Sequence, residues 1–213
     1  MKRNNYCFII ISILLALYIF IITFSYVRNV STNLSQSVFR LHIIANSDSR
    51  EDQDLKYKVR DDLISYMNSL SKSFDSKDET IAYVSNHLED FEKIANQTIE
   101  TNGFTYRANA EIGNFSFPTK TYGDIRLPSG NYDALDVKIG KAEGKNWWCV
   151  LYPSLCFVDV TSGYVPEESK TELKDSLSEE EYALISDNES SNIKFKFKLV
   201  EFFTNNNIFV AKK

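Results

Sequence analysis

The chain has 213 residues, of which 43% are hydrophobic and 14% aromatic, so it can bury one sizeable core and is expected to form one folded domain. The charges before Asn29 are three basic groups and no acidic group, and the remainder holds 21 basic and 29 acidic groups, a net charge of −8. Such a surface disfavours the binding of nucleic acid and of anionic lipid headgroups.

An apolar stretch lies at the start of the chain. Cys7 to Val27 form 21 positions without a formal charge, close to the roughly 20 residues that span a bilayer as a helix. The stretch is longer than the apolar core of a cleavable signal peptide and ends without a small-x-small site, which favours its retention as an anchor. Lys2 and Arg3 predict that the N-terminus stays in the cytoplasm and that the bulk of the chain lies across the membrane. The chain then divides into a cytoplasmic N-terminus and membrane anchor at 1–28, a linker at 29–37 and an extracytoplasmic domain at 38–213.

A strand and two helices are expected next. Val38 to Ala45 has the pattern of a strand, and the turn after it offers Asp48 or Ser49 as the N-cap of a helix. Apolar residues then recur at helical spacing, at Leu55, Val59, Leu63, Met67 and Leu70. The sequence from Ser76 to Glu79 forms a capping box for a second helix, which Asn102-Gly103 ends.

The period then changes to two. Phe104 to Ile112 alternates as a half-buried strand does, and we expect a turn at Gly113-Asn114. A further strand from Phe115 to Tyr122 is interrupted by Pro118, and Leu127 to Gly130 forms another turn.

The densest apolar and aromatic material lies at 130–159. Leu135, Val137 and Ile139 alternate with polar residues, and an apolar run follows a glycine-flanked turn at 140–144, which predicts a hairpin whose second arm is a central, buried strand. Neighbouring residues of a strand point to opposite faces, so Trp147 joins the apolar side while Trp148 sits opposite Asp136 on the polar face.

The C-terminal part has a weaker pattern. Ser178 to Glu181 caps a short helix through Ile185, whereas residues 193–203 fit a strand and a helix equally well. Two helices followed by several strands indicate an α+β domain, with an antiparallel sheet and the helices packed on one of its faces.

Motifs of catalytic and metal sites are missing. Residues 140–146 resemble a phosphate loop but are one residue short between the glycines and lack the Ser or Thr that binds magnesium, so we interpret them as a turn. No Gly-x-Ser-x-Gly, His-Glu-x-x-His or Asp-Thr/Ser-Gly motif occurs, and neither His42 nor His87 has a ligand partner at metal-site spacing. We therefore expect no catalytic residue, metal, cofactor or small-molecule substrate.

Two blocks carry a resemblance to a known family. The first is RLHIIANSDS followed by DQ-x-LK-x-x-VRD, and the second is LPSGNYDAL followed by NWWCVLYPSLC. Together they resemble the stage II sporulation protein R family of endospore-forming bacteria, with departures at Asp136, where a basic residue is usual, and at Ser154, where proline is usual. The resemblance implies a non-enzymatic signal, made in the forespore and acting between the forespore and mother-cell membranes. Its implied partner is a membrane-embedded aspartic protease, which matures the mother-cell sigma factor.

The resemblance and the residue patterns together nominate six residues for contact with the protease, namely Arg40, His42, Asn46, Asp48, Arg60 and Trp148. His42 has an alternative explanation as a sheet histidine bonded to backbone, and Asp48 has one as a helix cap. Arg40 and Arg60 can pair with acidic groups within the domain or across an interface, and both outcomes stay open. Trp148 is a candidate interface anchor unless the C-terminal segment covers it.

Cys149 and Cys156 are a candidate disulfide, because Pro153 can reverse the chain between them and an extracytoplasmic location permits oxidation. The alternative is two buried thiols that behave as small hydrophobic residues.

Two other functions compete with the activator. One is a cell-envelope hydrolase that uses carboxylates near the 130–159 hairpin, and the other is a scaffold that tethers envelope proteins without signalling. The sequence cannot place two carboxylates at catalytic separation, so it leaves these functions open.

Overall fold

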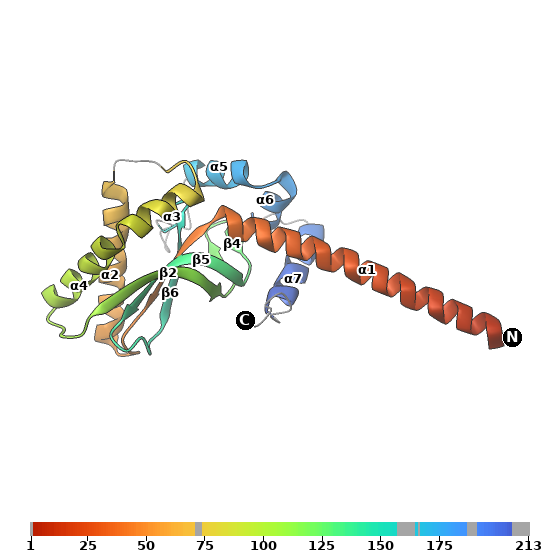
Figure 1. Ribbon diagram of the computed structural model, residues 1–213, viewed down its shortest axis with the longest axis horizontal. Helices are drawn as coiled ribbons and strands as arrows, with labels where there is room; N and C mark the ends of the chain where they lie inside the picture. The colour runs from red at the N-terminus through yellow and green to blue at the C-terminus, as the bar shows by residue number, and fades with distance from the viewer. Residues whose placement is uncertain (1, 71–73, 157–164, 166, 187–190, 206–213) are drawn as a thin grey trace.

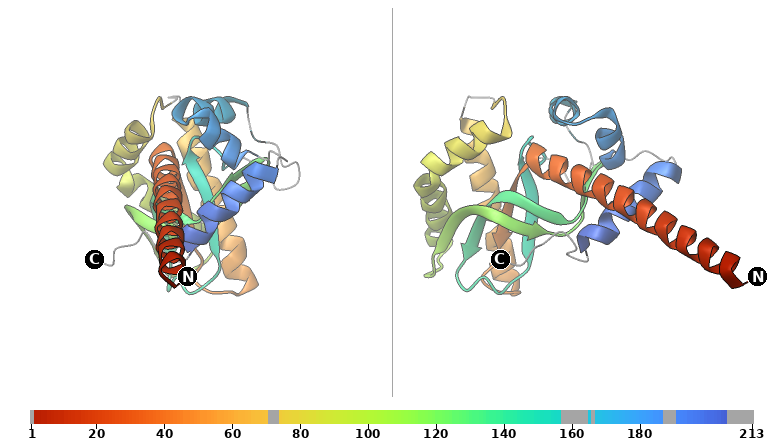
Figure 2. Two further views of the ribbon diagram at one scale, coloured as in Figure 1. Left: turned by 90° about the vertical axis from the view of Figure 1, so that its right-hand side faces the viewer. Right: turned by 45° about the vertical axis from the view of Figure 1, so that its right-hand side comes forward.

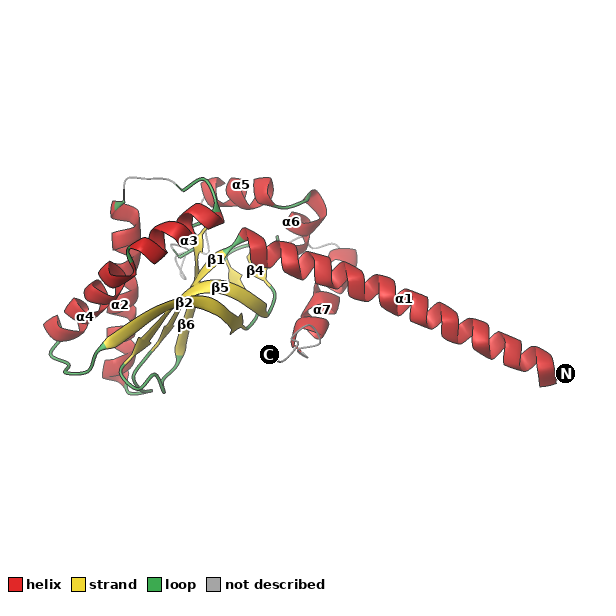
Figure 3. Cartoon of the chain, in the orientation of Figure 1, coloured by secondary structure: helices red, strands yellow, loops and turns green. Residues whose placement is uncertain are grey.

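The computed structural model describes residues 2–70, 74–156, 165, 167–186 and 191–205 of the chain (Figure 1). The helices are α1 Lys2–Ser37, α2 Arg50–Ser69, α3 Lys77–Asn86, α4 Leu88–Thr101, α5 Glu167–Ser176, α6 Glu179–Ile185 and α7 Ser191–Asn205. The strands are β1 Phe39–Ile44, β2 Ala108–Phe117, β3 Lys120–Tyr122, β4 Ile125–Leu127, β5 Gly130–Ile139 and β6 Asn146–Tyr152. The fold is α+β with a long apolar helix at the N-terminus, as the sequence predicts (Figure 3).

A mixed four-stranded sheet forms the centre of the domain, with the strand order β2-β5-β1-β6. β1 runs parallel to β5 and antiparallel to β6, and β2 runs antiparallel to β5. The expectation of a purely antiparallel sheet is therefore wrong for the β1–β5 pair. β3 and β4 form a separate two-stranded hairpin.

The hairpin predicted at 130–159 is also wrong, because β1 lies between β5 and β6; residues 157–159 lie outside the described part of the chain. The loop after β5 passes over the end of β1: Lys141 N donates to Asn46 Oδ1 at 2.9 Å, and Gly144 N donates to Ala45 O, also at 2.9 Å. Two strands separated by a third are about 9.6 Å apart, so a loop that crosses β1 must be wider than a tight turn. As a result β6 is an edge strand and not a central one.

The two faces of the sheet differ in composition. One face, here called the apolar face, carries Leu41, Ile43, Leu135, Val137, Trp147 and Cys149. The opposite face, here called the polar face, carries Arg40, His42, Glu111, Asp136 and Trp148. α2 and α4 pack with the apolar face into one core, to which they contribute Leu55, Val59, Leu63, Phe91, Ala95 and Ile99. The expectation that the helices gather on one sheet face holds for these two.

The stretch between the apolar segment and β1, predicted as a linker, is helical. Residues 29–37 are the last turns of α1, which runs unbroken from Lys2 to Ser37. Val27, Val30 and Leu34 recur at helical spacing, so they lie on one side of α1. All three are buried in the domain core. The apolar helix and the domain are therefore joined rigidly.

Local signals in the first half of the chain give mixed outcomes. Ser49 is the N-cap of α2, its Oγ accepting from Asp52 N at 3.2 Å, and Asp48 is not the cap. The single helix expected after Ser76 is broken at His87, where φ is −120° and α4 starts anew. His87 is thus partly buried at the junction between α3 and α4.

The predictions for β2 and for the C-terminal part are also partly correct. β2 starts four residues later than expected, at Ala108, and continues through Gly113-Asn114 to Phe117, so no turn exists there. The capping box at Ser178 is confirmed, with Ser178 Oγ accepting from Glu181 N and the Glu181 carboxylate accepting from Ser178 N. α5 was not expected, and the ambiguous segment 193–203 lies within α7.

Candidate partner-binding site

One row of side chains crosses the polar face from edge to edge, and we call it the cross-sheet row. The strand register places Glu111 of β2 opposite Asp136 of β5, Asp136 opposite His42 of β1, and His42 opposite Trp148 of β6. Residues in register on adjacent strands share a face of the sheet, so these four side chains are immediate neighbours.

His42 is the centre of the row. Its Nδ1 lies 2.6 Å from Asp136 Oδ1, a contact that becomes a salt bridge when the imidazole is protonated. Its Nε2 lies 3.1 Å from Asn146 Oδ1. Its ring stacks on Trp148 with the ring centroids 3.7 Å apart and the planes only 4° from parallel. His42 is therefore held on three sides, and its ring in turn fixes the orientation of the Trp148 indole.

Lys138 links the two carboxylates of the row. Its ammonium group lies 3.4 Å from Asp136 Oδ2 and also donates to Glu111. The hydrogen bond to Glu111, followed by the nearby Asp136 carboxylate, raises the pKa of Lys138 although burial opposes the shift. Because Lys138 stays protonated at neutral pH, it balances the charge of Asp136, whose side chain is almost fully buried.

Aromatic rings continue the site beyond Trp148. The Phe117 ring lies 4.7 Å from Trp148, centroid to centroid, and the Arg40 guanidinium carbon lies 4.1 Å above the same Phe117 ring. Arg40 also lies 4.8 Å from the centroid of Tyr132 and donates through Nη2 to the hydroxyl of Tyr122 at 2.6 Å. Arg40 is fully buried, and among the described residues its charge is stabilised by ring faces and a phenol.

Burial determines the charge state around Arg40. It raises the pKa of Tyr122, although the Arg40 guanidinium works in the opposite direction. Tyr122 therefore stays a neutral phenol, which accepts from Arg40 and itself donates to Trp148 O at 3.3 Å. The β3–β4 hairpin thus covers the Arg40 end of the polar face and supports the backbone of β6 at Trp148.

Asn46 and Asp48 are used by the scaffold at the other end of β1. Besides the contact to Lys141 N, Asn46 donates through Nδ2 to Asp52 Oδ2 at 2.9 Å. Asp48 Oδ1 accepts from Lys145 N at 2.7 Å, which attaches the loop after β5 to the start of α2. Gly140 is required here because its φ is +57° and a Cβ would lie 2.2 Å from Asn46 Oδ1.

Asp52 completes this loop cluster. It accepts from Asn46, Ser47 and Tyr106, and it is nearly buried. Burial alone would raise the pKa of its carboxyl group, but the hydrogen bonds from Ser47, Tyr106 and Asn46 outweigh burial and lower the pKa. The anionic form of Asp52 is thus a structural element that joins β1, α2 and the segment before β2.

Arg60 lies on the other side of the sheet. It is an α2 residue that pairs with Asp61 at 2.6 Å and places its guanidinium 4.4 Å above the Trp147 ring. Tyr57 meets the same indole edge to face, with the ring centroids 5.5 Å apart. The structure therefore separates Arg60 from His42 and Trp148, and it joins Arg60 to the tryptophan predicted for the apolar side.

Cys149 and Cys156 form a disulfide in the structure, with their Cα atoms 5.2 Å apart. The bond closes the chain reversal that follows β6 and fixes the end of the edge strand that carries both tryptophans.

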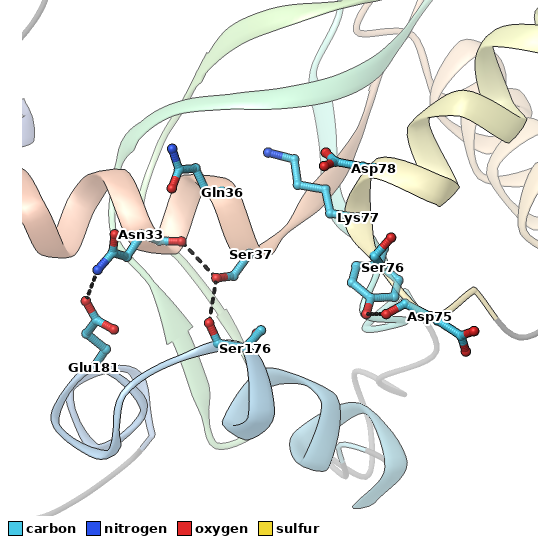
Figure 4. Close-up of a pocket in the computed structure, with 10 residues that line it drawn as sticks. Asn33, Gln36, Ser37, Asp75, Ser76, Lys77, Asp78, Ser176 and Glu181 are labelled. Carbon is cyan, nitrogen blue, oxygen red and sulfur yellow. Dashed lines mark hydrogen bonds between the residues drawn. The ribbon is translucent and has the colours of Figure 1, made fainter.

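A polar cavity of about 350 Å³ lies where α1 meets α3 and the α5–α6 pair (Figure 4). Lys77, one of its lining residues, donates to Ser35 O at 2.6 Å and to Asp133 at 2.7 Å. Glu181, on the opposite wall, accepts from Asn33 at 2.6 Å. Both charged groups already have hydrogen-bond partners within the domain. We therefore interpret the cavity as a polar gap between packed helices and not as a ligand site.

Residues 35–162 match the family model described as Stage II sporulation protein R (spore_II_R). The chain belongs to this family. It is 36% identical over 137 residues to the Stage II sporulation protein R of Bacillus subtilis (strain 168), covering 64% of this chain and 61% of that relative. No solved structure matches the chain.

The family match covers the sheet and leaves out the C-terminal helices. It includes all four strands of the sheet, the cross-sheet row and both cysteines of the disulfide. Most of α1 and all of α5, α6 and α7 lie outside it.

Two of the four members of the row, His42 and Trp148, were predicted as site residues from the sequence. The prediction that Trp148 lies directly opposite Asp136 is wrong, because His42 lies between them. Glu111, Lys138 and Phe117 were missed. The sequence indicated for Glu111 only that it lies in an alternating strand. Because Glu111 and Asp136 are far apart in the sequence, no local pattern predicted that they pair. The parity of that strand gave its face but not its partner.

Proposed function

We propose that this chain is a membrane-anchored extracytoplasmic signalling protein that activates a membrane-embedded aspartic protease during endospore formation. The protease then matures the precursor of the mother-cell sigma factor. The family membership supports a sporulation role, and the apolar stretch of α1, with Lys2 and Arg3 at the start of the helix, supports an anchor whose domain lies outside the cytoplasm.

The observation that carries the proposal is the rigid support of a partly exposed indole. Trp148 stacks on the nearly buried His42, which Asp136 and Asn146 orient, and Phe117 packs beside it. Large aromatic side chains that are already ordered in the free protein lose little entropy on binding and contribute strongly at interfaces. Trp148 is thus suited to anchor a protein partner.

Activation requires more than docking. The chain must bind the active conformation of the protease more tightly than the inactive one, because equal affinity for both would leave their populations unchanged. A rigid surface suits this task, since it selects among partner conformations without adapting to each.

The hydrolase alternative is less well supported. Asp136 already contacts His42 and Lys138, and Asp133 contacts Lys77 and Asn114. Paired carboxylates of glycosidases must instead flank a space that admits the sugar and, in one class, a water. In the described part of the chain these two carboxylates serve as ion-pair partners.

Reconstitution outside sporulation tests the proposal. The full chain, the candidate protease and the sigma precursor are produced together in a bacterium that makes none of them, and precursor cleavage is measured. We expect cleavage only when all three are present, a loss of at least tenfold with Trp148→Ala, and normal cleavage with the matched aromatic control Tyr57→Ala on α2. Cleavage that is independent of the chain would reject the activator function, and a scaffold would leave the precursor intact.

A further inference from the structure

α7 lies beside the part of the apolar helix α1 that is nearest the domain, in every view (Figures 1 and 2). The Phe203 ring centroid is 6.1 Å from that of Phe20 and 6.3 Å from that of Phe24. Phe20 and Phe24 belong to the uncharged stretch that ends at Val27. With a rise of about 1.5 Å per residue, they lie about 5 to 10 Å inside the outer end of that stretch. The C-terminal turn of α7 is therefore level with residues assigned to the bilayer.

The orientation of α7 is fixed by its inner side. Phe197, Val200 and Phe203 are buried, and the guanidinium of Arg126 lies 4.4 Å above the Phe197 ring. Thr204 forms a buried hydroxyl pair with Ser129 at 2.9 Å. These contacts attach α7 to the rest of the domain, and the unbroken α1 joins that domain to the apolar stretch. The side of α7 that faces outward is consequently fixed with respect to the membrane.

The outward-facing side of α7 carries two large apolar residues that are exposed. Phe195 is 69% exposed and Phe202 is 61% exposed. They are seven residues apart, which places them on one side of the helix two turns from each other. Lys198 is exposed between them. Large apolar residues with a cation beside them are typical of a helix that lies in the boundary between lipid headgroups and acyl chains.

We propose that α7 is an interfacial membrane helix that inserts Phe195 and Phe202 into the outer leaflet next to α1. The occupant of this face is the lipid bilayer, because the contacts of Phe203 with Phe20 and Phe24 continue a surface already assigned to lipid. The inference rests on the part of the proposed function that makes α1 a membrane span. The second attachment fixes the tilt of the domain, and with it the direction in which the cross-sheet row faces.

Depth-dependent fluorescence quenching tests this proposal on the full chain in phosphatidylcholine vesicles. An environment-sensitive fluorophore is attached to a single reactive cysteine in a Cys7→Ser background, in which Cys149 and Cys156 remain bridged. Separate variants carry Phe202→Cys, Phe195→Cys, Leu14→Cys in the middle of the apolar stretch, or Gln97→Cys on α4. Lipids with doxyl groups at shallow or deep positions quench a probe at the matching depth.

We expect shallow doxyl lipids to quench the probes at 195 and 202 at least threefold more than the probe at 97, and deep doxyl lipids to quench the probe at 14 most. Quenching at 14 together with equal quenching at 202 and 97 would overturn the α7 inference and leave the anchor intact. Weak quenching at 14 would refute the membrane span and the inference with it. Protection of position 202 from aqueous iodide without lipid quenching would mean that a protein covers this face, which also overturns the proposal.

Discussion

Trp147 and Trp148 are neighbours on one edge strand, yet they belong to different parts of the molecule. Trp147 lies on the apolar face between β6 and α2, where Arg60 and Tyr57 cover it. Trp148 lies on the polar face against His42 and Phe117, with a histidine–carboxylate pair behind it. Alternation along the strand sends the two indoles to opposite sides, and we propose that Trp147 serves stability and Trp148 recognition.

Replacing each tryptophan with alanine in turn should lower the free energy of unfolding to different extents. Trp147→Ala leaves a gap between α2 and the sheet, and we expect it to lower the free energy of unfolding by about 3 kcal/mol. Trp148→Ala removes ring stacking at a partly exposed site, and we expect a loss of about 1 kcal/mol. Urea unfolding of the full chain in detergent micelles, followed by far-ultraviolet circular dichroism, measures both. Equal losses would contradict the division of roles.

Removing the disulfide should affect both tryptophans together. Cys149→Ala with Cys156→Ala releases the end of β6, and the short closed loop predicts a loss of about 2.5 kcal/mol on the chain-entropy model. The pairing itself is checked by alkylating the unfolded, unreduced chain, where Cys7 alone should react. Three labels instead of one would show that the two cysteines are free thiols.

A smaller, pH-dependent effect is expected at Asp52, in the loop cluster after β1. The pKa of Asp52 is lowered in the folded state from an ordinary value near 3.8, so its anion stabilises the fold above that pH, and the contribution is lost as the pH falls through the folded-state value. Asp52→Asn should cost about 1 kcal/mol at neutral pH and progressively less below about pH 4. A pH-independent difference in the free energy of unfolding would mean that the charge of Asp52 does not matter.

The sequence predicted well what depends on nearby residues. The stripe at Leu55, Val59 and Leu63, the cap at Ser49 and the box at Ser178 are all local, since each feature spans a few turns of one helix. The break at His87 was missed because apolar spacing continues across it.

The pairing of strands could not be predicted in the same way. β1 pairs with β5 and β6 across long separations in the sequence, since His42 pairs with Asp136 and with Trp148, and no local pattern in residues 130–152 reveals that a third strand enters between them. The faces of Trp147 and Trp148 were nevertheless correct, because a strand inserted in register preserves the parity of both arms. His42 simply took the place between Asp136 and Trp148.

The ambiguity of 193–203 has a similar origin. Phe195 and Phe197 alternate with lysines as in a strand, while Phe195, Leu199, Phe202 and Phe203 can share one side of a helix. Packing against α1 and the rest of the domain favours the helix, which buries Phe197, Val200 and Phe203 on one side. That choice depends on an element at the opposite end of the chain.

Site-specific photocrosslinking tests most directly whether the polar face is where the protease binds. A photoreactive phenylalanine replaces either Asn146, exposed beside His42, or Tyr57, exposed on α2 behind Trp147, in cells that also make the protease. We predict a covalent adduct with the protease from position 146 and none from position 57. Adducts from position 57 alone would contradict the account and place the contact on the apolar side of the sheet.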